Sequence, residues 1–211
     1  MPERKLVVGV VLFPGYATLD AAGPMQFFDQ LADVLETVTI ARVAGPQYSL
    51  PPAGGCGMVA AYSFEDAPVL DVLLLPGGRG CRGLFHDPAY QTFVRHQSTR
   101  VQYLLTVCTG SGFLAACGLL DGRRATTNKR AFHEIAQLGD GRVVWVPHAR
   151  WVVDGNIWTS SGVTAGMDMV CAFLTKLFGA PRLQSVLEII EYTPATDPAD
   201  DAFAYLANAQ S

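Results

Sequence analysis

A cysteine placed between an apolar run and a helical pattern is the feature of this sequence best suited to covalent chemistry. Cys108 follows the apolar run 103–107 and precedes Gly110 and Gly112, whose lack of a side chain lets a substrate approach the backbone. A nucleophile on a tight turn between a buried strand and a helix forms a nucleophile elbow. Because a helix start favours the thiolate through its unpaired N–H groups and its dipole, we expect a lowered pKa for Cys108. An ordinary buried cysteine is equally compatible with the local pattern.

An isolated acid, Asp20, follows the first apolar run of the chain. It lies within FPGYATLDAAGP, residues 13–24, where its neighbours are apolar. Doubly wound sheets bind ligands beyond the carboxyl ends of their strands, and burial there would raise the pKa of the acid into the range useful for proton transfer. The alternative is a structural carboxylate that complements the start of a helix capped by Thr18.

A glycine-rich loop follows a further apolar run. The segment LPGGRG, residues 75–80, can present backbone N–H groups to a negatively charged intermediate, which makes Gly78 and Arg79 candidate oxyanion or substrate-binding residues. A plain turn from a strand to a helix explains the same segment equally well.

The remaining cysteines have weaker claims to chemistry. Cys117 and Cys171 lie among apolar residues of helical patterns and are interpreted as core. Cys56 and Cys81 lie in glycine-rich loops, which allow exposure, and we expect no neighbour to activate them. Five scattered cysteines without a CxxC pair are typical of reduced thiols in a cytoplasmic protein and suggest neither a disulfide framework nor a metal site.

The composition narrows the class of protein. Half of the residues are hydrophobic and 16% are charged, as expected for one α/β domain whose strands are covered on both faces. A net charge of -4 without a Lys/Arg cluster argues against nucleic-acid binding. No apolar stretch approaches the ~18 residues of a membrane span. The first apolar run stops at a Pro-Gly pair without a cleavage pattern, so we expect a strand there and no signal peptide.

Short apolar strands alternate with helical patterns, which predicts βα units and a doubly wound, mostly parallel sheet. Strands are expected at 6–13, 38–44, 70–75, 101–107, 143–146, 149–153 and 157–160, with a short strand or hairpin near 58–61 after a proline- and glycine-rich loop over 45–57. Helices are expected from 18 to about 35 and at 88–97, 112–120, 164–178 and 181–192. We expect a single domain over 1–192 and a C-terminal tail over 193–211 that packs on a neighbour or is partly disordered.

Four segments taken in order resemble the ThiJ/PfpI superfamily, also called class I glutamine amidotransferase-like. They are FPGYATLDAAGP, LLPGGRG, VCTGSGFLAACGLLDGRRATTNKRAFHE and SSGVTAGMDM, and the similarity extends from about Lys5 to about Tyr192. Within the superfamily, Asp20 and the elbow Cys108-Thr109-Gly110 resemble the isocyanide hydratase branch. One departure concerns the segment after the paired threonines, which reads Asn128-Lys129-Arg130 where relatives often carry His or Trp.

This resemblance implies a flavodoxin-like sandwich, a homodimer and a catalytic Cys108 close to Asp20. It also implies that Thr109 bonds to that acid or to the nucleophile region. The implied activity is the hydration of an isocyanide to an N-substituted formamide, without metal or organic cofactor. We expect Gly78, Arg79, Gly110 and Asn128 to line the oxyanion or substrate site.

Three other functions are considered. One is a glyoxalase-like or amidohydrolase activity of the same superfamily, and another is a non-catalytic sensor in which Cys108 is oxidised to a sulfinate. The third, transcription regulation, is not expected because about twenty residues after Tyr192 leave no room for a helix-turn-helix module. His133 is interpreted as a helix-surface residue and not as a third member of a catalytic triad.

Overall fold

A seven-stranded sheet forms the centre of the molecule. The computed structural model describes residues 4–51 and 53–208. The strand order is β10-β11-β7-β6-β1-β2-β5, and only β10 runs antiparallel to its neighbour. The strands are β1 (Leu6–Val11), β2 (Leu35–Ala41), β5 (Tyr62–Ser63), β6 (Val72–Leu75), β7 (Tyr103–Thr106), β10 (Trp151–Asp154) and β11 (Ile157–Ser160). The central strands β6 and β1 are apolar runs because both faces of the sheet are covered.

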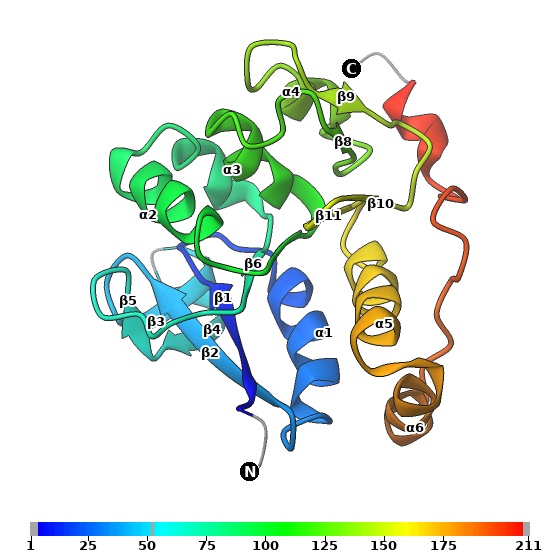
Figure 1. The fold of residues 1–211 in the computed structure, drawn as a ribbon. Coiled ribbons are helices and arrows are strands. Elements are labelled where there is room, and N and C mark those ends of the chain that lie inside the picture. Colours follow the sequence, from blue (N-terminus) through cyan, green and yellow to red (C-terminus); the bar gives the residue numbers. More distant parts are fainter. Residues whose placement is uncertain (1–3, 52, 209–211) are drawn as a thin grey trace.

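Helices cover the two faces in separate groups (Figure 1). They are α1 (Thr18–Asp29), α2 (Pro88–Ser98), α3 (Ser111–Ala116), α4 (Phe132–Ala136), α5 (Ala165–Phe178) and α6 (Ala180–Ile190). One group consists of α1, α5 and α6, which pack on one another, and the other joins α3 to α2 and α4. The predicted doubly wound α/β sandwich is therefore confirmed.

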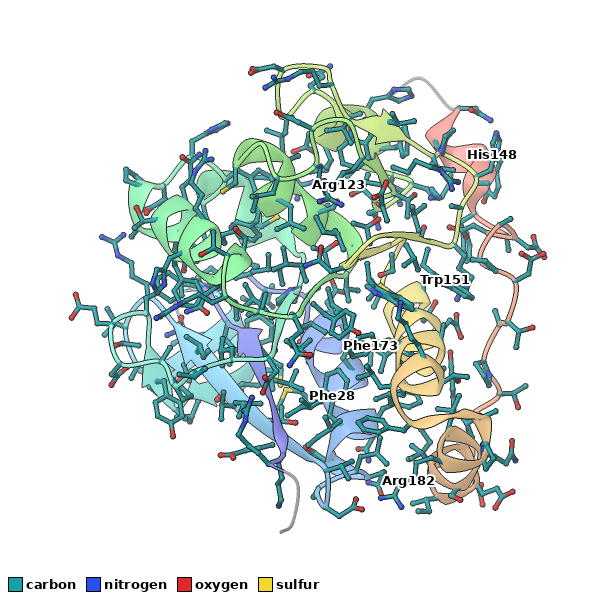
Figure 2. The ribbon with its side chains drawn as sticks, viewed as in Figure 1. Phe28, Arg123, His148, Trp151, Phe173 and Arg182 are labelled. Atoms are coloured by element: carbon teal, nitrogen blue, oxygen red, sulfur yellow. The ribbon has the colours of Figure 1, made fainter. Side chains whose placement is uncertain are left out.

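Large aromatic residues fill the layer between the first helix group and the sheet. Figure 2 shows Phe28 on α1 and Phe173 on α5, which are 1% and 0% exposed. The ring of Phe173 meets those of Tyr103 and Trp158 edge to face, with centroids 5.2 and 5.4 Å apart. These contacts hold α5 against the strands β7 and β11.

The boundaries of several elements differ from those expected. The first helix ends at Asp29, and Leu35 begins β2 in register with Leu6, whereas we had extended the helix to Leu35. The helix after Cys108 ends at Ala116, because Gly118 adopts a φ of +70° and closes the turn. In contrast, β11 spans 157–160 as predicted.

The expected loop over 45–57 was wrong, because this segment forms an antiparallel hairpin. Its strands are β3 (Gly45–Leu50) and β4 (Gly54–Ala60). A Cβ on Gly57 would lie 2.9 Å from the ring of Tyr48, so the glycine makes room for an aromatic side chain on the opposite strand. Glycine and proline, which usually indicate a loop, here serve cross-strand packing.

The described part of the tail, 193–208, runs back along the body of the chain. Figure 1 shows it in orange to red, passing from α6 beyond α5 toward β8 (Arg124–Ala125) and β9 (Val144–Trp145). The N–H of Arg150 donates to the carbonyl of Pro198 at 2.8 Å, and Asp201 is buried. A short 3-10 turn, Ala204–Ala207, follows.

Candidate active site

Three loops meet at the carboxyl ends of adjacent parallel strands. The strands β7, β6 and β1 are neighbours, and the segments that follow them carry Cys108 in a 3-10 turn, Gly77 in a loop and Asp20 in the first turn of α1. Backbone hydrogen bonds tie these loops together: Val107 N–H donates to Leu75 O at 3.1 Å, and Ala17 N–H donates to Gly77 O at 2.8 Å. This sheet edge is where doubly wound folds bind their ligands.

Cys108 has a strained backbone that its neighbours hold in place. Its φ is +57°, a value shared by few non-glycine residues. Its N–H donates to the carbonyl of Ser161 at 2.9 Å, and its carbonyl accepts a hydrogen bond from the hydroxyl of Thr127 at 3.0 Å. Such strain persists where the surroundings over-determine it, and it is common at functional sites. The elbow predicted from the sequence is present, and the side chain of Cys108 is 6% exposed.

Asp20 is fully buried in the first turn of α1 and has one unused oxygen. Its Oδ2 accepts the N–H of Gly77 at 2.9 Å, whereas Oδ1 has no hydrogen-bond partner of good geometry among the described residues. Burial raises the pKa of Asp20 to about 7, although hydrogen bonding from Gly77 and from the Cys108 side chain opposes the rise. The raised pKa confirms the expectation from its apolar neighbours.

The pKa of Cys108 moves in the direction opposite to our expectation. Burial raises it well above its ordinary value, and the charge of Asp20 raises it further. The backbone N–H of Thr109 and the side chain of Asn128 oppose this by hydrogen bonding to the sulfur. Burial away from water therefore changes the pKa of Cys108 more than the position at a helix start does. At neutral pH the thiol keeps its proton while Asp20 is divided between its acid and carboxylate forms.

The glycine loop is packed against the elbow. A Cβ on Gly77 would lie 2.6 Å from both N and Oγ1 of Thr109, so only glycine fits there. The N–H of Gly78 donates to Thr109 Oγ1 at 3.1 Å. We expect from the sequence that this N–H faces a reaction intermediate, but in the structure the Thr109 hydroxyl already occupies it. The hydroxyl of Thr109 bonds to this loop and not to Asp20.

Cys81 is a buried neighbour of the site that the sequence analysis missed. Its Sγ donates to Gly78 O at 2.9 Å and lies 3.2 Å from Thr109 Oγ1. Cys81 is not exposed as its loop would have allowed, because the 3-10 turn Arg79–Gly83 folds the thiol inward. Only its position just after a buried strand hinted at this. Burial raises its pKa to about 11, which agrees with the expectation that no neighbour activates this thiol. Cys56 is exposed and Cys117 and Cys171 are buried, as predicted.

Asn128 contacts the nucleophile from the opposite side. Its Oδ1 accepts the N–H of Ala131 at 3.2 Å, which leaves the amide NH₂ to hydrogen-bond to the sulfur of Cys108. Its neighbour Thr127 bonds to the Cys108 carbonyl. The segment that departs from the usual pattern of relatives thus borders the elbow.

Two of the expected site residues contribute differently. Arg79 is exposed and has no hydrogen bond or ion pair within 4–51 and 53–208. A Cβ on Gly110 would lie 2.1 Å from Leu75 O, so this glycine serves the packing of the elbow on β6 and not the approach of a substrate. His133 is exposed on α4, as predicted.

A cavity of about 430 Å³ lies beside the elbow, with Asn128 and Ser161 in its wall.

Among the described residues, no group of three or more His, Cys, Asp or Glu side chains could hold a metal ion. In that same part of the chain, no helix is long and apolar enough to cross a membrane.

The fold and the site define an α/β protein with a cysteine at a nucleophile elbow and a buried acid beside it. The DJ-1/PfpI family model matches residues 7–176, and the chain belongs to this family. It is 37% identical over 190 residues to the isonitrile hydratase of Pseudomonas putida, covering 90% of this chain and 80% of that protein. A deglycase of Pyrococcus horikoshii is 32% identical over 97 residues, which cover 46% of this chain and 55% of that protein. The crystal structure of a ThiJ/PfpI family protein from Pseudomonas syringae superposes with a TM-score of 0.81 at 28% identity, covering 90% of this chain and 76% of that one.

Proposed function

We propose that this protein hydrates an isocyanide to the N-substituted formamide, with Cys108 as nucleophile and Asp20 as acid and base. The observation that carries the proposal is the fully buried Asp20, which accepts the N–H of Gly77 in the loop packed against Thr109 and keeps Oδ1 without a hydrogen-bond partner among the described residues. Burial raises its pKa to about 7, and its charge raises the pKa of the Cys108 thiol. The isonitrile hydratase of Pseudomonas putida, 37% identical over most of both chains, supports the choice of substrate class.

The first step forms a covalent adduct. Asp20 as carboxylate takes the thiol proton, and the Cys108 sulfur attacks the terminal carbon of R–NC. Asp20, now the acid, gives its proton to that carbon, which yields a thioimidate, R–N=CH–S–Cys108. A pKa of about 7 suits both directions of proton transfer, because neither form of Asp20 is scarce at neutral pH.

The second step releases the product. Asp20 as carboxylate accepts a proton from water, whose oxygen adds to the thioimidate carbon, and Asp20 then gives this proton to the nitrogen to form R–NH–CH(OH)–S–Cys108. Collapse of the tetrahedral adduct breaks the C–S bond and forms the carbonyl of R–NH–CHO. The proton of the adduct's hydroxyl group passes to the departing sulfur and restores the Cys108 thiol. The sum is one isocyanide and one water to one formamide, and no cofactor is required.

Stabilisation of the sulfur and of the developing charge is assigned to the N–H of Thr109 and the amide of Asn128. Both hydrogen-bond to the sulfur of Cys108, whereas the N–H of Gly78 is occupied by the hydroxyl of Thr109. The Thr109 hydroxyl then acts by positioning the glycine loop. We also propose that the protein works as a cytoplasmic homodimer and that 1–192 form its single domain, with 193–211 as a tail.

Turnover of p-nitrophenyl isocyanide by the wild type, Cys108→Ala and Asp20→Asn tests the proposal. We expect formamide from the wild type and loss of turnover in both variants, while Cys56→Ser, which changes an exposed thiol, retains full activity. Asn at position 20 keeps an acceptor for the N–H of Gly77 but cannot shuttle a proton. Methylglyoxal serves as the rival substrate. Turnover of methylglyoxal alone, or of the isocyanide by Cys108→Ala, would contradict the proposal.

A further inference from the structure

The cavity beside the elbow is built jointly by the loops of the site and by the C-terminal tail. Its volume is about 430 Å³. Its lining comprises Asn128, Lys129, Arg130, Arg150, Ser161, Gly162, Val163, Thr164, Asp201, Phe203, Tyr205 and Leu206. The tail reaches this place by running back past α5 (Figure 1). Its wall adjoins the elbow: the carbonyl of Ser161 accepts the N–H of Cys108 at 2.9 Å, and Asn128 follows Thr127, whose hydroxyl donates to the Cys108 carbonyl at 3.0 Å.

Most charged groups in the wall are already engaged with one another. Lys129 Nζ donates to Thr126 Oγ1 at 2.7 Å and to Ala149 O at 2.6 Å, and it lies 3.7 Å from Asp201. Arg150 pairs with Asp168 at 2.5 Å. Its Nη1 also lies 3.7 Å from Asp201. Two cations are thus balanced by two acids, while Arg130 is exposed and makes no side-chain ion pair with the residues that the structure describes.

Much of the remaining lining consists of large apolar and aromatic side chains. Val163 lies on one side, and the tail supplies Phe203, Tyr205 and Leu206 on the other. The two aromatic residues are 53% and 64% exposed, although large apolar side chains of this kind usually gain free energy from burial. An apolar group placed in the cavity would cover them.

We propose that this cavity binds the apolar substituent R of the isocyanide, preferably an aromatic ring, and that Phe203 and Tyr205 of the tail determine the size of the substituent accepted. This inference rests on the proposed function and specifies its substrate class. Asp201, which bonds to the body through Lys129 and Arg150, holds the tail in place, so the aromatic residues form a fixed wall.

The first test compares isocyanides of increasing size, from methyl through cyclohexyl to p-nitrophenyl isocyanide. In Phe203→Ala, Tyr205→Ala and the double variant, we expect kcat/KM for the aryl substrate to fall about tenfold through a raised KM, with little change for methyl isocyanide. Val69→Ala is the matched control, because Val69 is 74% exposed and precedes the amino end of the central strand β6, whereas the site lies at the carboxyl ends of the strands. Equal losses for methyl and aryl substrates would overturn the inference.

The second test does not depend on isocyanide turnover. Peptide mass spectrometry follows the alkylation of Cys108 by iodoacetamide and by N-benzyl iodoacetamide, with the exposed Cys56 as internal reference. We expect the benzyl reagent to react faster relative to the small one in the wild type, and the double variant to lose most of this preference. An unchanged preference in the double variant overturns the cavity assignment. If the preference falls but the wild type hydrates no isocyanide, the cavity assignment stands and the proposed function fails.

Discussion

The raised pKa of Asp20 makes the free energy of unfolding depend on pH in a way that Asp20→Asn should abolish. Because the folded state holds the proton up to pH about 7 and an unfolded aspartate only up to about 4, the folded state binds more protons between these values. Stability therefore falls as pH rises through this window, by about 1.4 kcal/mol per pH unit. The contribution of Asp20 is complete below pH 4, is lost progressively up to pH 7 and is constant above it.

Asp20→Asn removes this loss of stability with rising pH, and its amide oxygen can still accept the N–H of Gly77. Between pH 5 and 7 the wild type should lose about 2 kcal/mol of stability relative to Asp20→Asn, because the slope flattens as pH approaches the folded pKa. Asp20→Asn should therefore be the more stable protein at pH 8, although the proposed mechanism predicts that it is inactive. Urea denaturation of both proteins at pH 5, 6, 7 and 8 measures the difference, in which all other titrating groups cancel. A difference between the two proteins that stays constant from pH 5 to 8 would refute the argument that Asp20 is held in a dry site.

Three further substitutions test the packing around the site. Gly77→Ala should destabilise the fold by about 2 kcal/mol or more in urea denaturation, because its Cβ would lie 2.6 Å from Thr109. Gly83→Ala is the control: its Cβ would have no atom within 4 Å, so stability should change by less than about 0.5 kcal/mol. Asn128→Asp should slow the alkylation of Cys108 by iodoacetamide at pH 7 about tenfold, because a carboxylate beside the sulfur disfavours the thiolate; a rate equal to the wild type would contradict the placement of Asn128. Lys129→Met should cost about 3 kcal/mol by leaving the buried Asp201 with one cationic partner, and adding Asp201→Asn should recover part of the loss; additive losses in the double variant would count against the pairing.

The features that the sequence predicted well are those set by local pattern and by strand order. An apolar run followed by small residues places Cys108 at an elbow, and the buried acid after β1 follows from a motif of apolar neighbours. Because parallel strands end at one edge of the sheet, loops distant in sequence meet there without further information. Both features are visible before any contact is known.

The features that escaped prediction depend on contacts between distant segments. Whether Cys81 faces water or Thr109 is decided by how the 3-10 turn packs on the elbow. The N–H of Gly78 is occupied because the Thr109 hydroxyl happens to reach it, a competition invisible in LPGGRG. The direction of the pKa shift of Cys108 depends on how completely the surrounding loops exclude water. Asp201 of the tail forms an ion pair with Lys129. No periodic pattern in the sequence could indicate this pairing.

The most direct test of the central claim is the detection of a covalent adduct on Cys108. Wild-type protein is mixed with p-nitrophenyl isocyanide, quenched with acid in the millisecond range and digested for peptide mass spectrometry. The proposed mechanism predicts a transient increase equal to the mass of one isocyanide on the peptide that contains Cys108, and none on that peptide in Cys108→Ala. Formamide production without any adduct on Cys108, or with the adduct on Cys81 or Cys56 only, would contradict it.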